Sequence, residues 1–315
     1  MNQAEKLKLY QEIETRLKTC KHVLLCSHVD PDGDTFGSAV AMNIALKSLG
    51  IDSTLFCKSN LPETLTPFLK DHKMIHEVPA DAPYDCVMVF DCGDSKRVEH
   101  HLPIDLNIDH HLENKVPGKI NLVDTDSAAT GQVVYGLLKY LKIPMNPELA
   151  TVLYLTMVAD TGFFRWDNTS AEVLQMCSDL VAAGAKPYFV NQALNETATV
   201  DKLQLLGNCL ANLKVVHNGN TVYSKAVVNE YNETAGFIDH IRRVSGTVVA
   251  LMFVQVGSAV KVSFRSKSND YQVQQVAKVF RGGGHAKAAG AHVPGTLDEV
   301  IPKVLSEIEK LYGAK

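Results

Sequence analysis

Short apolar runs alternate with amphipathic segments along the first two thirds of the chain. The apolar runs typical of buried strands are HVLLCSH (22–28), STLFCK (53–58), YDCVMVFDCGD (84–94), LNIDHH (106–111) and KINLVD (119–124). The segments with helical spacing of apolar residues cover 35–50, 127–141, 146–162 and 169–184. Strands that alternate with helices are typical of a parallel sheet. We therefore expect an α/β fold, a parallel-sheet domain with helices on both faces and KINLVD as an edge strand.

The pattern changes near residue 215. A helix around 199–214 is followed by two β-rich runs, TVYSKAVV and TVVALMFVQVGSAVKVSFRS, and the second run reads as a hairpin that turns at Gly257. Short helices are expected around 271–280 and 296–312. The predicted parts are a catalytic α/β domain over 1–190, a helical linker over 191–214 and a smaller α+β domain over 215–315.

Composition narrows the class of protein. The chain has 315 residues, 46% hydrophobic and 21% charged, as ordinary globular proteins do. No apolar run approaches the roughly 18 residues of a membrane helix, and the start, MNQAEKLKLYQEIETRLK, is a polar amphipathic helix rather than a signal peptide. The seven cysteines form no CxxC pair, which favours reduced thiols and a cytoplasmic location.

Charge is unevenly distributed between the two parts of the chain. Residues 215–315 contain 12 Lys and Arg against 8 Asp and Glu, a net charge of +4, whereas residues 1–214 have a net charge of −8. An acidic first part suits cation binding and a basic second part suits an anionic ligand. Two ordinary solvated faces would give the same count.

The stretch SHVDPDGDTFGS places His28 beside three aspartates, Asp30, Asp32 and Asp34. A solvated turn around Pro-Asp-Gly is the plainest interpretation. A calcium loop would need Gly at its sixth position and Glu at its twelfth, where this chain has threonine and alanine. The third interpretation is a metal site that takes its other ligands from elsewhere in the chain.

Acidic and histidine residues also stand at the ends of other predicted elements. Asp91 ends one strand, Asp109, His110 and His111 end another, and Asp160 ends a helical run. In open parallel sheets, ligands bind beyond the carboxyl ends of the strands. We therefore expect these side chains to meet those of the SHVDPDGDTFGS stretch at one rim.

Several carboxylates share one site in their charged form only when cations neutralise them. Carboxylate and imidazole ligands without cysteine favour Mn²⁺, Mg²⁺, Fe²⁺ or Co²⁺ over a structural zinc. Six such ligands suit two ions about 3.5–4 Å apart, and such pairs hydrolyse phosphate esters.

The glycine-rich stretch RGGGHAKAAG begins at Arg281 and matches neither a Walker loop nor a GxGxxG fingerprint. A flexible turn is one interpretation. An anion site is the other, because the backbone N–H groups of Gly283 and Gly284 can approach phosphate oxygens beside His285. Arg265 ends a β run in the same domain, and a guanidinium can grip a terminal phosphate with two parallel hydrogen bonds.

These stretches resemble a known family. Four stretches are similar, in order, to the four motifs of the DHH phosphoesterase superfamily: HVDPDGDTFGS, VFDCGD, NIDHH and VADTGFF. Two later stretches are similar to the nucleotide-binding motifs of the DHH-associated C-terminal domain found in the same superfamily: VSFRSKS and RGGGHAKAAGAHV. The resemblance covers nearly the whole chain. The compact length is similar to the nanoRNase group of oligoribonucleases and pAp phosphatases, because the longer RecJ-like exonucleases carry extra domains.

The resemblance implies two divalent cations, Mn²⁺ in first place and Mg²⁺ or Co²⁺ as alternatives. It implies His28 and Asp32 as ligands of one ion, Asp34, His110 and Asp160 as ligands of the other, and Asp91 as the bridge.

The resemblance also implies a catalytic group of Asp91, Asp109 and His111. Asp109 would orient a ligand histidine and His111 would face the substrate phosphate. The family often has Asn in the first motif where this chain has Asp30, whose extra charge the sequence does not explain. The implied substrate-binding residues are Arg265, Arg281, Gly283, Gly284 and His285.

We expect hydrolysis of short RNA or DNA oligonucleotides such as pApA to mononucleotides, and of pAp to AMP.

An inorganic pyrophosphatase of the same superfamily would share the metal ligands but would need a Lys- and Arg-rich second domain. A non-catalytic nucleotide-binding module should have lost a ligand. A long-strand exonuclease would need an extended basic track with aromatic platforms, whereas this chain has a net charge of −4 and one Trp. No membrane partner is expected, and a homodimer is left open.

Overall fold

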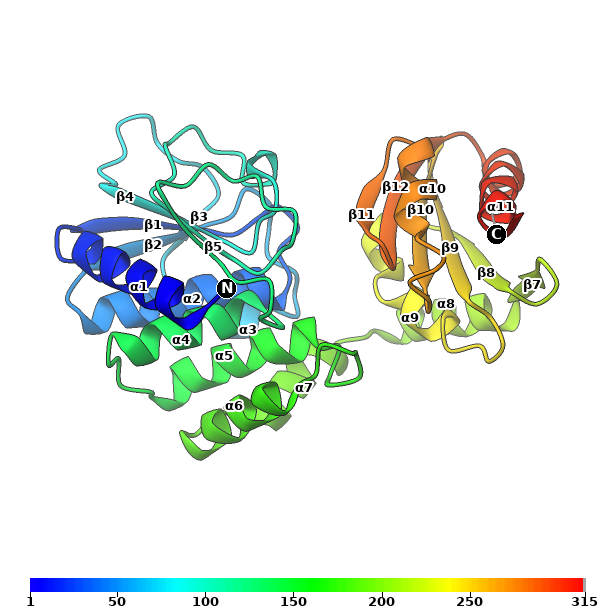
Figure 1. Cartoon of the computed structure of the whole chain (residues 1–315). Helices are drawn as coiled ribbons and strands as arrows, with labels where there is room; N and C mark the ends of the chain where they lie inside the picture. Colours follow the sequence, from blue (N-terminus) through cyan, green and yellow to red (C-terminus); the bar gives the residue numbers. More distant parts are fainter. Residues whose placement is uncertain (314–315) are drawn as a thin grey trace. The chain divides into compact units, whose positions relative to one another are not determined.

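The computed structural model describes residues 1–313. The chain divides into two compact units, the first ending at Thr197 and the second beginning at Ala198. Figure 1 shows both units, each with its own sheet. Within the described residues, no helix combines the length and the apolar character that crossing a membrane requires.

The first unit contains a six-stranded parallel sheet in the order β3-β2-β1-β4-β5-β6. Its strands are β1 (His22–Cys26), β2 (Asp52–Phe56), β3 (Met74–Ile75), β4 (Cys86–Phe90), β5 (Leu106–Asp109) and β6 (Ile120–Val123). All five residues of β4 are buried, which is typical of a central strand in a parallel sheet. The predicted parallel sheet is confirmed, and β6 lies at its edge as expected.

Helices cover one face of this sheet. The helices of the unit are α1 (Gln3–Leu17), α2 (Gly33–Ser48), α3 (Thr66–Leu69), α4 (Thr130–Tyr140), α5 (Pro147–Asp160), α6 (Ala171–Ala182) and α7 (Pro187–Asn195). Val23 and Leu25 of β1 join the apolar cluster that contains the helices. The alternate residues Leu24 and Cys26 join a separate cluster, completed by loop residues such as Val116.

The expected helices on both faces are therefore not found in the described part of this unit. The connections that follow β4 and β5 contain no α-helix, only the 3₁₀ turn η1 (Ser95–Arg97). They cross the second face as loops, because they are short and lack apolar residues at helical spacing.

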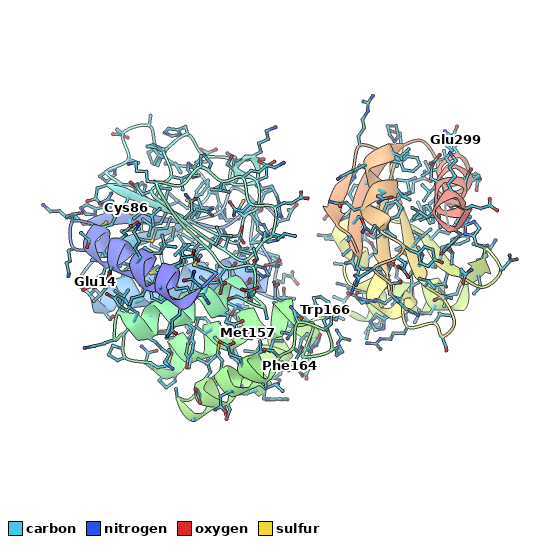
Figure 2. The ribbon with its side chains drawn as sticks, in the orientation of Figure 1. Glu14, Cys86, Met157, Phe164, Trp166 and Glu299 are labelled. Carbon is cyan, nitrogen blue, oxygen red and sulfur yellow. The ribbon has the colours of Figure 1, made fainter. Side chains whose placement is uncertain are left out.

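Close helix packing brings the start of α2 to the end of α5, which contains the buried Met157 (Figure 2). A Cβ atom on Gly33 would lie 2.8 Å from the Ala159 side chain, and one on Gly37 would lie 2.7 Å from that of Thr156. Larger residues at these two positions would push the helices apart. The small residues of α2 therefore determine where the acidic residues near its first turn meet α5.

The second unit contains a mixed sheet in the order β11-β12-β10-β9-β8-β7, in which only β8 and β9 pair in parallel. Its strands are β7 (Lys214–Val216), β8 (Thr221–Val227), β9 (Val249–Val256), β10 (Ala259–Ser266), β11 (Gly283–His285) and β12 (Ala288–Pro294). Its helices are α8 (Val200–Ala211), η2 (Tyr231–Thr234), α9 (Phe237–Ile241), α10 (Val273–Val279) and α11 (Leu297–Gly313). Helices α10 and α11 pack on one face, and α8 and α9 pack on the other. The α+β class and the hairpin that turns at Gly257 are confirmed.

The helix expected around 199–214 is α8, and it packs within the second unit. Cys209 of α8 is 2% exposed, and its carbonyl accepts a hydrogen bond of 2.7 Å from Ser224 Oγ of β8. The domain boundaries at residues 190 and 214 stay a prediction.

Candidate metal centre

Aspartate and histidine side chains converge beyond the carboxyl ends of β1, β4 and β5. Three groups have ligand atoms that lie within 4.8 Å of one another: Asp91 with Asp109, His110 and His111; His28 with Asp32 and Asp91; and Asp34 with His110 and Asp160. Asp91 belongs to two of the groups and His110 also to two. The structure therefore brings together all six residues expected to bind metal, from segments up to 132 positions apart in the sequence.

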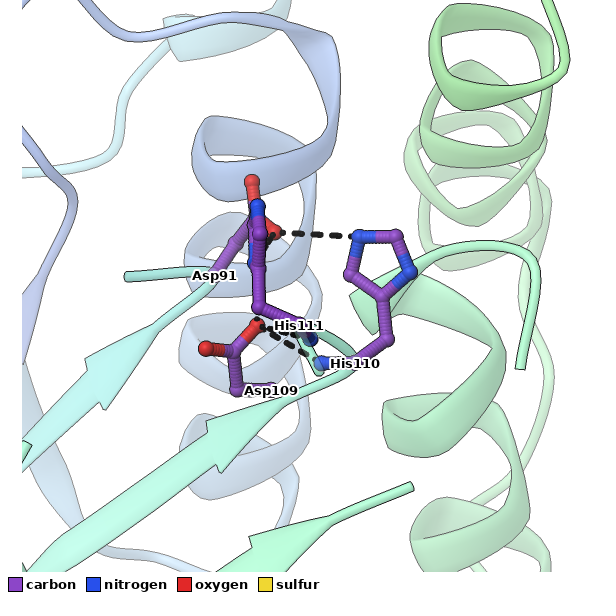
Figure 3. A group of neighbouring side chains, drawn as sticks. All are labelled: Asp91, Asp109, His110 and His111. Carbon is purple, nitrogen blue, oxygen red and sulfur yellow. Dashed lines mark hydrogen bonds and ion pairs between the residues drawn. The ribbon is translucent and has the colours of Figure 1, made fainter. Parts of the chain in front are cut away.

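Asp91 lies between two histidines. Its Oδ1 is 3.5 Å from His110 Nε2 and its Oδ2 is 3.8 Å from His28 Nε2; Figure 3 shows the contact with His110. Thr130 Oγ1 donates a hydrogen bond of 3.1 Å to Oδ1. The residue directly follows β4 and has a φ of 54°, a left-handed conformation that aspartate tolerates better than most residues. Strained backbone of this kind is concentrated at functional sites.

Asp34 is fully buried and is held by the N-terminus of α4. Its carboxylate accepts hydrogen bonds from the backbone N–H groups of Thr130 (2.6 Å) and Gly131 (2.9 Å). The positive end of the helix dipole favours a carboxylate at this position. His110 Nε2 lies 3.9 Å from Asp34 Oδ2 and 3.1 Å from Asp160 Oδ2, so the three side chains surround one point.

The proton on the buried ring of His28 and on the half-buried ring of His110 can be assigned from the neighbouring atoms. His28 Nδ1 lies 2.8 Å from the Val29 carbonyl oxygen, and His110 Nδ1 lies 3.2 Å from the Ser127 carbonyl oxygen, so both Nδ1 atoms donate. A nitrogen of the exposed Arg97 is also 3.0 Å from His28 Nδ1. A donating nitrogen cannot accept as well, and we assign the proton to the shorter contact. The Nε2 lone pairs then point toward the carboxylates, as metal ligation requires.

Asp109 orients a different histidine from the one expected. Its Oδ1 accepts a hydrogen bond of 2.7 Å from the Nδ1 of His111, and bonds from the backbone N–H groups of His110 and His111 (Figure 3). The ring that it orients is thus that of His111 and not that of the expected ligand His110, whose ring is held by Ser127. Two consecutive rings project in different directions, and sequence alone could not tell which one the carboxylate reaches.

The carboxylates of the cluster are so crowded that protons or cations must neutralise part of their negative charge. Burial raises the pKa of Asp91 to about 7 and that of Asp34 well above its usual range. Burial would lower the pKa of His110, but its hydrogen bonds to Asp160 and Asp91 outweigh this and raise the pKa to about 12. Protons thus offset the crowded carboxylates, and a cation bound to the same atoms would replace those protons. The donor set therefore fits divalent cations.

Asp30 takes no part in the three groups. Its backbone N–H donates to Ser59 Oγ at 2.7 Å, its φ is 52°, and the residue is exposed. Asn and Asp are the non-glycine residues that enter the left-handed region most readily. This conformation explains why an aspartate can stand where the resemblance leads one to expect asparagine.

Ser127, Thr130 and Gly131 hold the cluster in place but were not predicted from the sequence. Their only sequence signal was local: they stand at the start of the helical run that begins SAATGQVV. The partners of Thr130, Asp34 and Asp91, are 96 and 39 positions away, and only the folded chain shows that the start of α4 meets them.

The predicted substrate residues of the second unit lie on neighbouring strands. Arg265 of β10 and His285 of β11 pair with the same residue, Ala288 of β12, from its two sides. The Arg265 guanidinium Nε lies 3.8 Å from Asp239 Oδ1 and its side chain is 27% exposed. Arg281 is exposed and stands before β11 with a φ of 58°. The side chain of His285 lies outside the described part of the structure.

The glycines of the predicted anion site are not equivalent. A Cβ atom on Gly284, whose φ is +131°, would lie 2.4 Å from the Ala288 carbonyl oxygen, whereas a Cβ on Gly283 would meet nothing within 4 Å. Gly283 and Gly284 lie in strand β11 and not in the flexible turn that was one interpretation of the stretch. Gly284 is therefore needed for strand packing, and Gly283 leaves open space beside the backbone.

Sequence comparison identifies both halves of the chain. Residues 22–157 match the DHH family, N-terminal domain, and residues 218–314 match the DHHA1 domain. A protein of Thermus thermophilus named bifunctional oligoribonuclease and PAP phosphatase NrnA is 30% identical over 97% of this chain and 94% of its own length. The protein of the same name from Bacillus subtilis is 24% identical, over 92% of this chain and 94% of its own.

Solved structures share the fold. An exopolyphosphatase-related protein from Bacteroides fragilis superposes with a TM-score of 0.90 at 21% identity, covering 97% of this chain and 96% of that one. RecJ of Thermus thermophilus in complex with Mn²⁺ superposes with a TM-score of 0.59 at 14% identity, covering 98% of this chain and 55% of that one. At these identities the likeness establishes the architecture alone.

Proposed function

The chain belongs to the DHH family, and from that premise we propose that it is a metal-dependent phosphoesterase that hydrolyses short oligonucleotides to mononucleotides and pAp to AMP. Its full-length relatives of known name are bifunctional oligoribonucleases and PAP phosphatases. An inorganic pyrophosphatase would share the metal ligands, but the relatives that match nearly the whole chain have names of nucleotide enzymes.

One observation carries the proposal, the convergence of carboxylate and imidazole side chains in three neighbouring groups, two of which contain Asp91. Oxygen and nitrogen ligands without thiolates suit Mn²⁺, Mg²⁺ or Co²⁺. The proposed ligands are His28 and Asp32 for one ion, Asp34, His110 and Asp160 for the other, and Asp91 for both. Divalent cations held there supply Lewis-acid stabilisation of charge that develops on a phosphoryl group.

The supporting residues keep the ligand atoms aimed at one point before substrate arrives. The N–H groups of Thr130 and Gly131 fix the Asp34 carboxylate, and the Ser127 carbonyl fixes the His110 ring. Hydrogen bonds of this kind orient a ligand and reduce the reorganisation needed in the reaction.

His111 is the proposed partner of the substrate phosphate. Its Nδ1 is committed to Asp109, so the contact would be made by Nε2. Burial lowers the pKa of His111, yet the hydrogen bond to Asp109 and the charge of Asp91 raise it above the ordinary value on balance. A charged imidazole can stabilise a phosphoryl oxygen or protonate the leaving oxygen.

The second unit is proposed to bind the nucleotide through Arg265, Arg281, Gly283, Gly284 and His285. Support comes from the register of the sheet, which puts Arg265 and His285 in one row across three strands. Adjacent strands lie about 4.8 Å apart, so the two backbones are roughly 10 Å apart, a span that one nucleotide phosphate and its sugar can bridge.

Two finer points belong to the same proposal. We propose Mn²⁺ as the ion that supports turnover best, because mixed carboxylate and histidine ligands suit it. We also propose a cytoplasmic location, because all seven cysteines are free and buried thiols.

The test is product analysis with purified full-length protein and Mn²⁺. Release of AMP from pApA and from pAp, lost with EDTA and restored by Mn²⁺, is the expected result. Hydrolysis of pyrophosphate together with inert pApA and pAp would overturn the proposal in favour of the pyrophosphatase. Inert protein with all three compounds under Mn²⁺, Mg²⁺ and Co²⁺ would support a non-catalytic module.

A further inference from the structure

An unusual backbone turn follows the metal-cluster residue Asp160. Gly162, Phe163 and Phe164 have φ angles of 55°, 61° and 61°, so three consecutive residues are left-handed. Left-handed residues normally occur singly, because Cβ atoms crowd the following carbonyl. Such strain persists only where the surrounding structure enforces it, and it is concentrated at ligand-binding positions.

Hydrogen bonds fix this turn to the cluster. The backbone N–H of Trp166 donates to the carbonyl of Thr161, the residue after Asp160, at 3.1 Å. Asn168 Nδ2 donates to the carbonyls of Asp160 (2.8 Å) and Ala128 (3.2 Å). The turn is therefore tied both to the end of α5 and to the segment that leads into α4.

The turn places Trp166 flat against a glycine. A Cβ atom on Gly162 would lie 2.4 Å from the indole Cε2 and 2.8 Å from Cδ2, so the ring lies directly over the glycine backbone. The side chain is 42% exposed. Figure 2 labels Trp166 and Phe164 at the carboxyl end of α5. One face of the indole thus rests on the backbone, and the side chain keeps an exposed surface six positions after the cluster residue Asp160.

We infer that Trp166 is a stacking platform for a nucleobase of the substrate. The inference rests on the proposed function, and it adds the chemical group by which the first unit itself recognises a nucleotide. An aromatic ring backed by a rigid turn binds a base with little loss of conformational freedom, and base stacking on aromatic side chains is a common mode of single-strand recognition.

The neighbouring Arg165 supports this assignment. Its Nε donates to the Gly162 carbonyl, and its guanidinium lies 6.0 Å from the centre of the Phe163 ring. The residue is exposed. A cation is thus held beside the platform, where the phosphate that accompanies a stacked base can pair with its remaining N–H groups.

One platform in the turn after Asp160 accepts one base. This arrangement favours a terminal nucleotide over the interior of a long strand, which would need several platforms along a track. It also favours purines over pyrimidines, because the larger ring system covers more of the indole.

The chain offers a direct test, because Trp166 is its only tryptophan. Tryptophan emission of the wild-type protein in Mg²⁺ is titrated with AMP and, separately, with ribose 5-phosphate. We expect saturable quenching by AMP and none by ribose 5-phosphate. This titration needs no turnover, so it tests stacking even if the protein hydrolyses no oligonucleotide. Unchanged emission at AMP concentrations that calorimetry shows to be saturating would overturn the inference.

Kinetics supply the second measurement. Trp166→Leu should raise KM for pApA about 5- to 100-fold and leave kcat within about threefold, because stacking contributes to binding. Trp166→Phe should recover most of the loss. Tyr188→Leu, which truncates another exposed aromatic residue on α7, is the control and should leave KM unchanged. A purely structural role for Trp166 predicts instead a lower melting temperature and an equal loss on pApA and on its analogue without bases, and that result would overturn the inference.

Discussion

The carboxylate cluster of the first unit and the glycine strand of the second are built in opposite ways. In the cluster, side chains supply the chemistry and the backbone holds them: Asp34 is fully buried and bonded to two N–H groups of α4. In β11, the backbone itself is exposed, and Gly284 is required because a Cβ atom would collide with the Ala288 carbonyl. We infer that the first region is rigid and charged for chemistry, and the second is an accessible edge for binding.

This difference decides how each region should respond to substitution. A change in the cluster leaves a buried charge without its partner and should affect metal binding and kcat. A change at the edge removes one contact in water and should affect KM.

Two left-handed aspartates form a matched pair. Asp91 and Asp30 have φ angles of 54° and 52°, but only Asp91 lies in the cluster. Asp91→Asn should lower kcat by more than about 10³-fold, because the charge that both ions would share is worth several kcal/mol. Asp30→Asn, which asparagine's tolerance of left-handed backbone permits, should stay within about threefold of wild type. Steady-state kinetics and metal analysis measure both. If Asp91→Asn kept a tenth of wild-type kcat, the shared ligand would be wrong.

Consecutive histidines give a second test within the cluster. His111→Ala should lower kcat about a hundredfold or more, as loss of a proton donor does, while the metal content stays unchanged. His110→Ala should instead lose bound metal, because its Nε2 faces Asp34, Asp91 and Asp160. Metal content of the dialysed variants separates the two. Loss of metal from His111→Ala alone would mean that His111 is the metal ligand and His110 the residue that contacts the substrate.

The chain order of residues predicted much of this architecture, for a physical reason. Apolar runs such as CVMVF identify buried parallel strands, and the rule that ligands bind at their carboxyl ends brings Asp91 and His110 to one rim. The hydrogen bonds that orient the side chains of the cluster could not be predicted from the sequence. The hydrogen bonds from α4 to Asp34 depend on how the helices pack, and the hydrogen bond from His111 to Asp109 depends on how two consecutive rings project. The second sheet face is covered by loops because the connections that cross it lack apolar periodicity. Trp166 belongs to no motif that we identified in the sequence. Its position over Gly162 follows from a left-handed turn that no local propensity favours.

The proposed nucleotide-binding residues of the second unit should affect KM when they are replaced. Arg265→Ala should raise KM for pApA about tenfold to a hundredfold, because a hydrogen bond to a charged group contributes roughly 1.5–3 kcal/mol, with metal content unchanged. Arg265→Lys keeps the charge but not the paired N–H groups and should recover only part of the loss. A fall in kcat with constant KM in Arg265→Ala would contradict the division between the regions.

The smallest effect separates two adjacent glycines. Gly284→Ala should lower the free energy of unfolding by about 1–3 kcal/mol, because alanine disfavours positive φ and its Cβ would lie against the Ala288 carbonyl oxygen. Gly283→Ala should leave that free energy within about 0.5 kcal/mol or raise it slightly, because its Cβ would meet nothing within 4 Å. The added methyl group would, however, occupy the open space from which a phosphate approaches the backbone, so KM for pApA should rise severalfold. Urea unfolding and steady-state kinetics on the two variants measure the pair. Unchanged KM in Gly283→Ala would show that this strand serves packing alone, and the substrate contacts would then lie elsewhere in the second unit.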